Sequence, residues 1–165
     1  MAITLARIDD RVIHGQTITR WASMRPVNSL IVISDDVAGD PLRVKVTKSA
    51  AQGYPVGIYN VEQGVAALEK VAKSPKDFFI ISDSVDTFAE LVRRGSNFGS
   101  MLNVGNYNRH REGAVDLGRC VSLTHSEVAT FDYLVEQGIE LQFQLLPDDA
   151  IRSWDGVKAK FNALA

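Results

Sequence analysis

The sequence predicts an α/β fold, with a doubly wound, mostly parallel sheet of six to seven strands and helices on both faces. Short apolar runs alternate with helical patterns of about 10–15 residues, and this alternation indicates right-handed βαβ units. Runs such as Leu30–Ile33 and Phe78–Ile81 are apolar at every position, as in strands that are covered on both faces. No repeat, low-complexity tract or linker divides the chain, so we expect a single domain over residues 1–165.

Composition narrows the class of protein. A chain of 165 residues with 45% hydrophobic and 23% charged residues is an ordinary globular chain that can bury a core. A formal net charge of -2 gives no electrostatic basis for nucleic acid as a partner. One cysteine rules out an internal disulfide and fits a reducing cytoplasm. The sequence has no apolar stretch of about 18 residues and no signal-peptide pattern, so any membrane association is expected to go through a partner protein.

In the first half of the chain, strands and helices alternate without interruption. The expected elements are a strand Ile3–Ile8, a helix Gly15–Met24, a strand Leu30–Ile33, a helix that ends at Gly53, a strand Val56–Tyr59 and a further helix. Pro26 stops the first helix because proline cannot continue one. Asp40 with the following proline predicts an N-cap and a first helical position. Asn60 and Gln63 have the spacing of a capping box.

The second half keeps this alternation around one polar loop. In order we expect a strand Phe78–Ile81, a helix Val85–Arg94 capped by Gly95, a strand Met101–Val104, the loop Gly105–Gly118, a strand Arg119–Leu123, a helix closing at Gly138, a strand Leu141–Leu145 and a C-terminal helix carrying Ile151, Trp154, Val157, Phe161 and Leu164. Thr124 and Glu127 form a second capping box, and Asp148 is expected to cap the last helix. Because Leu141–Leu145 alternates strictly, we expect it at the sheet edge.

Polar loops follow four of the predicted strands. They begin at Asp9, Ser34, Ser82 and Gly105. The carboxyl ends of parallel strands share one edge, and ligands of doubly wound domains bind there. A functional site is therefore expected at this edge.

The first of these loops is unusually rich in charge, with two arginines, two aspartates and a histidine between Arg7 and His14. The imidazole of His14 can accept and release a group near neutral pH, and it lies at a predicted helix start that favours an anion. Arg7 and Arg11 offer forked donors that match phosphate. Asp9 or Asp10 can accept the other ring N–H and fix its tautomer. We therefore hypothesise a nucleophilic histidine that carries a phosphoryl group.

Other polar and aromatic residues have plainer interpretations. Neither a Walker loop nor GxGxxG, HxxxH or CxxC occurs, so no nucleotide, cofactor or metal site is predicted. We interpret Cys120 as a core residue of a strand and both tryptophans, Trp21 and Trp154, as packing residues. His125 is expected to be exposed on a capped helix. His110, between two arginines, fits either a basic rim or a solvated loop.

From Arg7 to Gln16 the chain reads RIDDRVIHGQ, followed by Trp21, and here it resembles the IIB component of the mannose/sorbose family of bacterial sugar phosphotransferase systems. The family's pattern at this place is close to RIDxRLIHGQ with a tryptophan just downstream. Further matches follow in order over essentially the whole chain, at Asp35–Asp40, Leu102–Asn106 and from Gly138-Ile139-Glu140 through Leu146-Pro147.

The resemblance implies a cytoplasmic phosphocarrier, a protein-histidine–sugar phosphotransferase with a phosphohistidine intermediate. A phosphorylated IIA protein donates the phosphoryl group, and the chain passes it to a sugar that enters through the membrane subunits IIC and IID. By this resemblance the phosphorylated histidine of the family falls on His14, its transition-state arginine on Arg11 and its orienting aspartate on Asp9. The residues expected to bind phosphate or support these three are Arg7, Asp10, Gly15 and Gln16. A homo-oligomer is compatible with the sequence.

The chain departs from the family pattern at two places on the predicted edge. It has Tyr107 where methionine is common, and Ser82-Asp83-Ser84 where a lysine is frequent. The carrier chemistry does not depend on either. Transfer between histidines of two proteins requires an exposed His14, and we expect Val12, Ile13 and Tyr107 to offer apolar docking contacts around it.

Two other functions use the same loop. One is a regulatory module that binds phosphate or another anion without reacting. The other is a hydrolase in which His14 acts as general acid and base with Asp9, and this function requires a deep substrate pocket.

Overall fold

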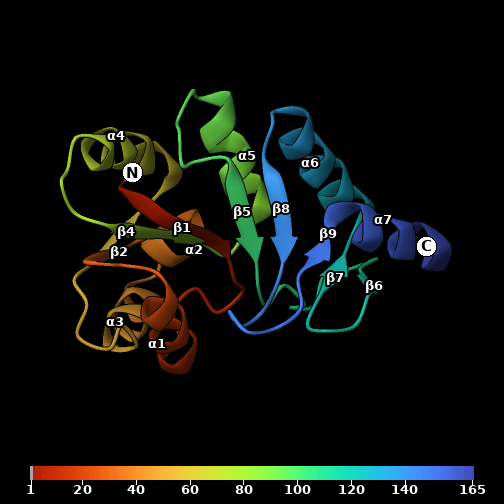
Figure 1. Cartoon of the computed structure of the whole chain (residues 1–165), viewed down its shortest axis with the longest axis horizontal. Helices are drawn as coiled ribbons and strands as arrows, with labels where there is room; N and C mark the ends of the chain where they lie inside the picture. The colour runs from red at the N-terminus through yellow and green to blue at the C-terminus, as the bar shows by residue number, and fades with distance from the viewer. Residues whose placement is uncertain (1) are drawn as a thin grey trace.

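The computed structural model describes residues 2–165. In that part of the chain seven strands form one sheet, in the order β3-β2-β4-β1-β5-β8-β9, with every neighbour parallel except the pair β8 and β9. The strands are β1 (Ile3–Ile8), β2 (Ser29–Ile33), β3 (Val56–Tyr59), β4 (Phe78–Ser82), β5 (Met101–Val104), β8 (Glu140–Phe143) and β9 (Arg152–Ser153). Strand β1 lies at the centre, between β4 and β5 (Figure 1).

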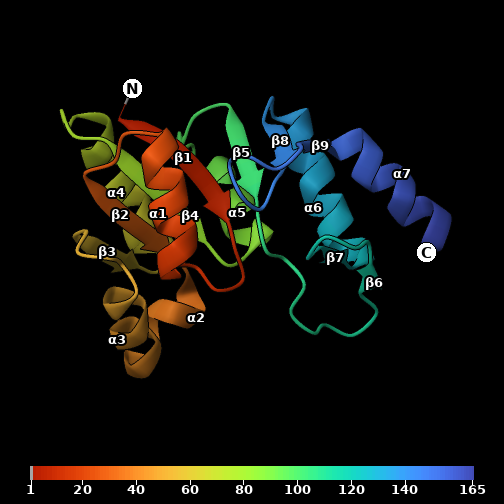
Figure 2. The same cartoon turned by 60° about the horizontal axis from the view of Figure 1, so that its bottom comes forward.

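Seven helices occur within the same residues. They are α1 (Gly15–Met24), α2 (Asp35–Ala38), α3 (Pro41–Ser49), α4 (Val61–Ala72), α5 (Val85–Arg93), α6 (His125–Glu136) and α7 (Trp154–Leu164). Helices α1 and α3 cover one face of the sheet, and α4, α5 and α6 cover the other (Figure 1). A small antiparallel pair, β6 (Val115–Asp116) and β7 (Ser122–Leu123), lies beside α6 (Figure 2). The predicted doubly wound α/β fold is confirmed.

Each face of the sheet has its own hydrophobic core. On the side of α4, α5 and α6 the core includes Phe88 and Phe131, both fully buried. On the side of α1 it includes Ile18 and Trp21. Strands such as β2 and β4 contribute side chains to both cores, which explains why their sequences are continuously apolar.

The capping signals identify several helix starts correctly. The boxes at Asn60 with Gln63 and at Thr124 with Glu127 are both formed in full. Asp40 accepts hydrogen bonds from the first-turn N–H groups of α3, with Pro41 at the first helical position. These three helix starts are set by side chains within a few residues of the cap, so they can be predicted from the sequence.

Two strand predictions are wrong. The segment Leu141–Leu145 does not form the edge, because β9 pairs with β8 on its outer side. A strand of two residues has no periodicity to detect. The strand predicted over Arg119–Leu123 is reduced to Ser122–Leu123, because Arg119 and Cys120 adopt left-handed backbone angles in a turn.

Helix ends also differ from expectation. Helix α7 begins at Trp154 and is capped by Ser153, not by Asp148, and Ile151 lies exposed before it. Helix α3 ends at Ser49, four residues before Gly53, and the one-turn helix α2 was not predicted. Within residues 2–165, none of the helices has both the length and the apolar character needed to cross a membrane.

Candidate active site

Backbone hydrogen bonds hold the polar loops together at the carboxyl edge of the sheet. The N–H of Asp9 donates to the carbonyl of Ser82, at 2.9 Å, and the N–H of Asp10 donates to the carbonyl of Asn106, at 2.7 Å. The carboxylate of Asp10 also accepts from the N–H groups of Asn108 and Arg109, at 2.5 and 2.7 Å. The loops after β1, β4 and β5 therefore meet, as their positions after parallel strands predict.

A tight turn sets the direction of His14. The N–H of Val12 donates to the carbonyl of Asp9, at 2.9 Å, and Val12 has a φ of 54°. A β-branched residue rarely adopts this left-handed conformation. The turn buries Val12 and Ile13 and leaves the side chain of His14 25% exposed, at the N-cap of α1. The expectation that Val12 and Ile13 offer docking contacts is wrong, because both belong to the core beneath the loop.

Two side chains contact the imidazole of His14. Its Nε2 lies 3.8 Å from Oδ2 of Asp9, an ion-pair distance rather than a hydrogen bond. The Thr17 hydroxyl lies 2.9 Å from Nε2 and 3.1 Å from Nδ1. Sequence reasoning missed Thr17, although a residue three positions after the N-cap faces the same side of the helix start.

Asp9 is completely buried, and both of its oxygens are bound. Oδ1 accepts from the N–H of Arg11, at 3.0 Å, and Oδ2 accepts from Nη2 of Arg7, at 2.9 Å. Burial alone would raise the pKa of Asp9, but the His14 side chain, the charge of Arg7 and the Arg11 N–H together hold it below its usual value. The group beside His14 is therefore a carboxylate at neutral pH.

Arg7 is 1% exposed, and both of its terminal nitrogens, Nη1 and Nη2, donate hydrogen bonds. Besides Asp9, its guanidinium donates to the side chain of Asn103 and to the carbonyls of Gln144 and Leu145, the last two at 3.2 and 3.0 Å. It also lies 5.4 Å from the centre of the Trp21 ring, within cation–π range. These contacts place Arg7 behind Asp9, as a support of the carboxylate that faces His14.

Arg11 is placed differently, with an exposed side chain on the outer side of the same loop. Within residues 2–165 its guanidinium takes part in no ion pair. It borders an open depression of about 780 Å³, whose lining consists of Arg11, His14, Gly15, Gln16, Thr17, Thr19, Arg20, Gln52, Leu145 and Leu146. The structure thus brings Arg11, His14, Gly15 and Gln16 to one surface.

The two departures from the family pattern have structural roles at the same edge. Tyr107 is 3% exposed, and its hydroxyl accepts from the N–H of Val85 at 3.4 Å, so it cannot serve as the expected docking contact. Burial raises the pKa of this hydroxyl far above its usual value. Asp83 is 2% exposed and lies 3.5 Å from the guanidinium of Arg43 and 3.7 Å from that of Arg109. The carboxylate in this loop therefore forms ion pairs with two arginines.

The remaining singled-out residues fall mostly as expected. Trp21 and Trp154 are buried, and His110 and His125 are exposed. The interpretation of Cys120 as a core residue is wrong. Its backbone is left-handed, and the residue is exposed at the surface.

A family model described as "PTS system sorbose subfamily IIB component" matches residues 3–164. The fructose-specific EIIB component of Bacillus subtilis is 32% identical, with 91% of each chain covered, and the sorbose-specific EIIB component of Klebsiella pneumoniae is 31% identical, with 90% of each covered. The crystal structure of the IIBSor domain of the Klebsiella pneumoniae sorbose permease superposes with a TM-score of 0.88 at 30% identity, over 100% of this chain and 99% of that one.

Proposed function

This chain belongs to the sorbose subfamily of PTS IIB components, and on that premise we propose that His14 is the residue through which it works. The family assigns it the function of a phosphocarrier in sugar uptake and makes it a sugar phosphotransferase. A phosphocarrier needs a nucleophile that a second protein can reach. The observation that supports His14 most strongly is an imidazole presented at a helix N-terminus with a buried carboxylate behind one of its nitrogens.

We propose that the phosphoryl group binds to Nδ1 of His14. Nε2 is the ring nitrogen that faces Oδ2 of Asp9, at 3.8 Å, so a proton on Nε2 lies in the field of the carboxylate. Nδ1 is then the unprotonated nitrogen, and its lone pair attacks phosphorus once the Thr17 hydroxyl, 3.1 Å from Nδ1, gives way. As the new P–N bond forms, the bond between phosphorus and the donor's nitrogen breaks, and that nitrogen keeps the electron pair.

Arg11 and the start of α1 stabilise the charge of the phosphoryl group in transit. The first N–H groups of a helix have no partner within the helix and attract anions. Helix α1 has no acidic residue in its first turn to compete for them. The guanidinium of Arg11, which lines the same depression as His14, adds forked donors. At Gly15 a Cβ atom would meet the end of the Gln52 side chain, so a larger residue there requires Gln52 to move.

The proposed partners follow from this function. A phosphorylated IIA protein donates from its own histidine, and the sugar receives the group at the membrane subunits IIC and IID. The open depression around His14 suits this role, because both imidazoles must flank one phosphorus. In this proposal the chain works in the cytoplasm, and it associates with the membrane only by binding IIC and IID.

The experiment is phosphoryl transfer from radiolabelled phospho-IIA to the full chain. We expect an acid-labile, base-stable label that is abolished in His14→Ala and retained in the matched controls His110→Ala and His125→Ala, whose histidines are exposed elsewhere. Persistent label in His14→Ala would exclude His14 as the phosphorylated residue.

The second candidate function is an anion-binding regulatory module, favoured by the uncompensated charge of Arg11 beside a helix start. Such a module would bind inorganic phosphate at this surface but would gain no label from phospho-IIA. The same experiment therefore separates the two functions.

A further inference from the structure

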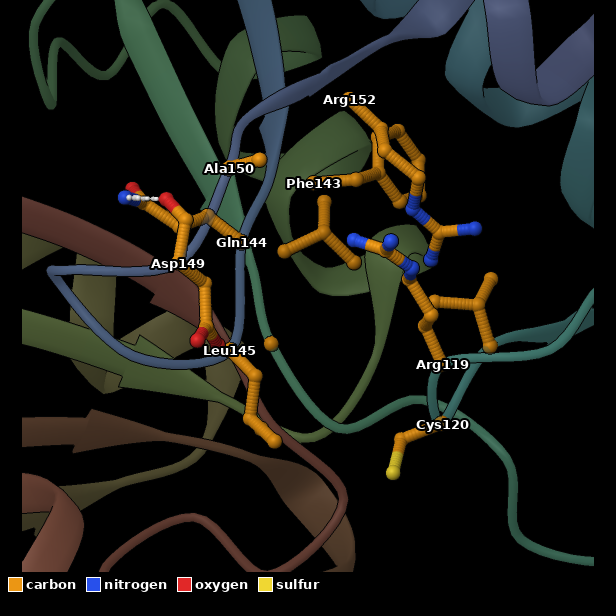
Figure 3. A pocket seen from close by; sticks show the side chains of 11 residues that line it. Arg119, Cys120, Phe143, Gln144, Leu145, Asp149, Ala150 and Arg152 are labelled. Atoms are coloured by element: carbon orange, nitrogen blue, oxygen red, sulfur yellow. Dashed lines mark hydrogen bonds between the residues drawn. The ribbon is translucent and has the colours of Figure 1, made fainter.

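Two neighbouring hollows lie away from His14, at the end of the sheet formed by β8 and β9. One, of about 280 Å³, is walled by Val121, Phe143, Leu145 and Cys120 among others. The other, of about 500 Å³, adjoins the start of α7. Arg119 and Arg152 line both hollows. These two arginines therefore stand where the hollows meet (Figure 3).

The guanidinium groups of Arg119 and Arg152 are turned toward one another (Figure 3). Neither takes part in an ion pair with any carboxylate of residues 2–165. Lys160 lines the second hollow and donates to the carbonyl of Leu117, at 2.8 Å, so its charge is also uncompensated there. Three positive charges therefore face one small region.

The acidic groups nearby are engaged elsewhere. Asp149 lines the first hollow on the side opposite the arginines, and its carboxylate accepts from the N–H of Leu146, at 3.0 Å (Figure 3). The carboxylate of Asp116 accepts from the N–H of Gly118, at 2.8 Å. Asp155 is exposed in the first turn of α7. None of them forms an ion pair with the facing arginines in the described part of the chain.

The backbone holds this arrangement at a conformational cost. Arg119 and Cys120 have φ values of 50° and 64°, which residues with side chains seldom adopt. Hydrogen bonds from the N–H of Val121 to the carbonyl of Gly118, at 3.1 Å, and from the N–H of Tyr107 to that of Cys120, at 2.8 Å, keep the turn in place. Strain of this kind persists where the surroundings enforce it, and it is concentrated at functional sites.

We propose that Arg119, Arg152 and Lys160 bind the phosphate of a small phosphate monoester, whose organic part occupies the hollow beside Phe143. Two guanidinium forks match the charge and geometry of a dianionic phosphate better than those of a single carboxylate. Burial first, and then the charge of Arg119, lowers the pKa of Arg152, so an anion between the two arginines relieves their repulsion. A volume of about 280 Å³ is just below the usual range of ligand pockets, which starts at about 300 Å³, and suits a compact molecule.

This site is additional to the proposed function, because His14 and Arg11 line neither hollow. The two regions share one segment. Leu145 lines the first hollow and also the depression at His14, and its carbonyl accepts from Arg7. A ligand in the hollow therefore lies against the segment that supports the phosphoryl site.

The test is an NMR titration of the full ¹⁵N-labelled chain with glucose 6-phosphate, inorganic phosphate and glucose. We expect saturable amide shifts at Cys120, Val121 and Phe143 with glucose 6-phosphate, weaker binding of inorganic phosphate and no shifts with glucose. Shifts at Gly15 and Gln16 report separately on phosphate bound near His14. No saturable shift at the hollow with glucose 6-phosphate would overturn the proposal, and equal affinities for the ester and for inorganic phosphate would overturn the role of the hollow.

The variant is Arg119→Gln, because the side chain of Arg119 is exposed and we expect the fold to tolerate its loss. This substitution should lower the affinity for glucose 6-phosphate by about tenfold or more, because one charge-assisted contact is lost. Arg93→Gln, an exposed arginine on α5, is the control with the same net charge and should leave affinity unchanged. Unchanged affinity in Arg119→Gln, or binding only to phosphatidylglycerol vesicles, would overturn the proposal. Labelling by phospho-IIA is measured independently, so failure here leaves the role of His14 standing.

Discussion

Two arginine-containing regions of this molecule differ in how their charge is balanced. Arg7 is buried, and its charge is compensated by Asp9 and by acceptors on three further residues. Arg119 and Arg152 face one another with no carboxylate in ion-pair contact within residues 2–165. A guanidinium in an ion pair with a buried carboxylate serves the fold, whereas one without an ion pair is available to a ligand. Arg11 belongs to the second kind.

The largest effect expected from this comparison is on stability. Arg7→Ala leaves the Asp9 carboxylate buried without its cation, so we expect the free energy of unfolding to fall by about 3–5 kcal/mol. Arg119→Ala should change it by no more than about 0.5 kcal/mol, because that side chain is exposed. Urea denaturation of both variants measures the two values, and similar losses would contradict the distinction between paired and unpaired arginines.

The next effect is on phosphoryl transfer. Arg11→Ala should slow transfer from phospho-IIA by about ten- to hundredfold, which corresponds to roughly 1.5–3 kcal/mol for a charge-assisted contact made to the moving group. Its unfolding curve should match that of the unaltered chain, since the guanidinium is exposed. Quench-flow labelling measures the rate. An undiminished rate would remove Arg11 from the mechanism, and a lower stability would place it with Arg7.

The smallest effect is the dependence of stability on pH. The pKa of Asp9 is lowered in the folded chain, so this carboxylate stabilises the fold above its unfolded pKa of about 3.9 and loses that contribution as the pH falls through the folded value. Asp9→Asn should be less stable at neutral pH, with a difference that narrows below about pH 4. Unfolding free energies of both chains from pH 7 down to acid give this difference. A gap that stays constant across that range would argue against an ionised Asp9 in the fold.

Much of the fold and the first site was accessible from sequence because each feature has a local signal. Continuous apolar runs gave the central strands, and side-chain caps gave the starts of α3, α4 and α6. The density of charge before His14 marked the loop. Thr17 has a signal too, its position three residues after the N-cap, but that signal is weak unless the helix start is known to be functional.

The features that were missed depend on contacts distant in sequence. Strand β9 is two residues long and is defined only by its pairing with β8. The turn has neither glycine nor asparagine at its two central positions, Arg119 and Cys120, to reveal it. Asp148 has the chemistry of a helix cap but forms an ion pair with Arg20, and Ser153 caps the helix instead. Tertiary pairing decides each of these cases.

The two tryptophans of the chain give each region its own spectroscopic reporter. The indole of Trp21 donates to the carbonyl of Leu145, at 3.3 Å, and lies against Arg7 behind the His14 loop. The ring of Trp154 stacks on Phe143, at 5.8 Å, and Phe143 walls the hollow beside Arg152. Trp21→Phe and Trp154→Phe therefore yield chains whose intrinsic fluorescence comes from one region at a time. Tryptophan emission can thus report separately on changes at the His14 loop and at the hollow beside Arg152, without an added dye.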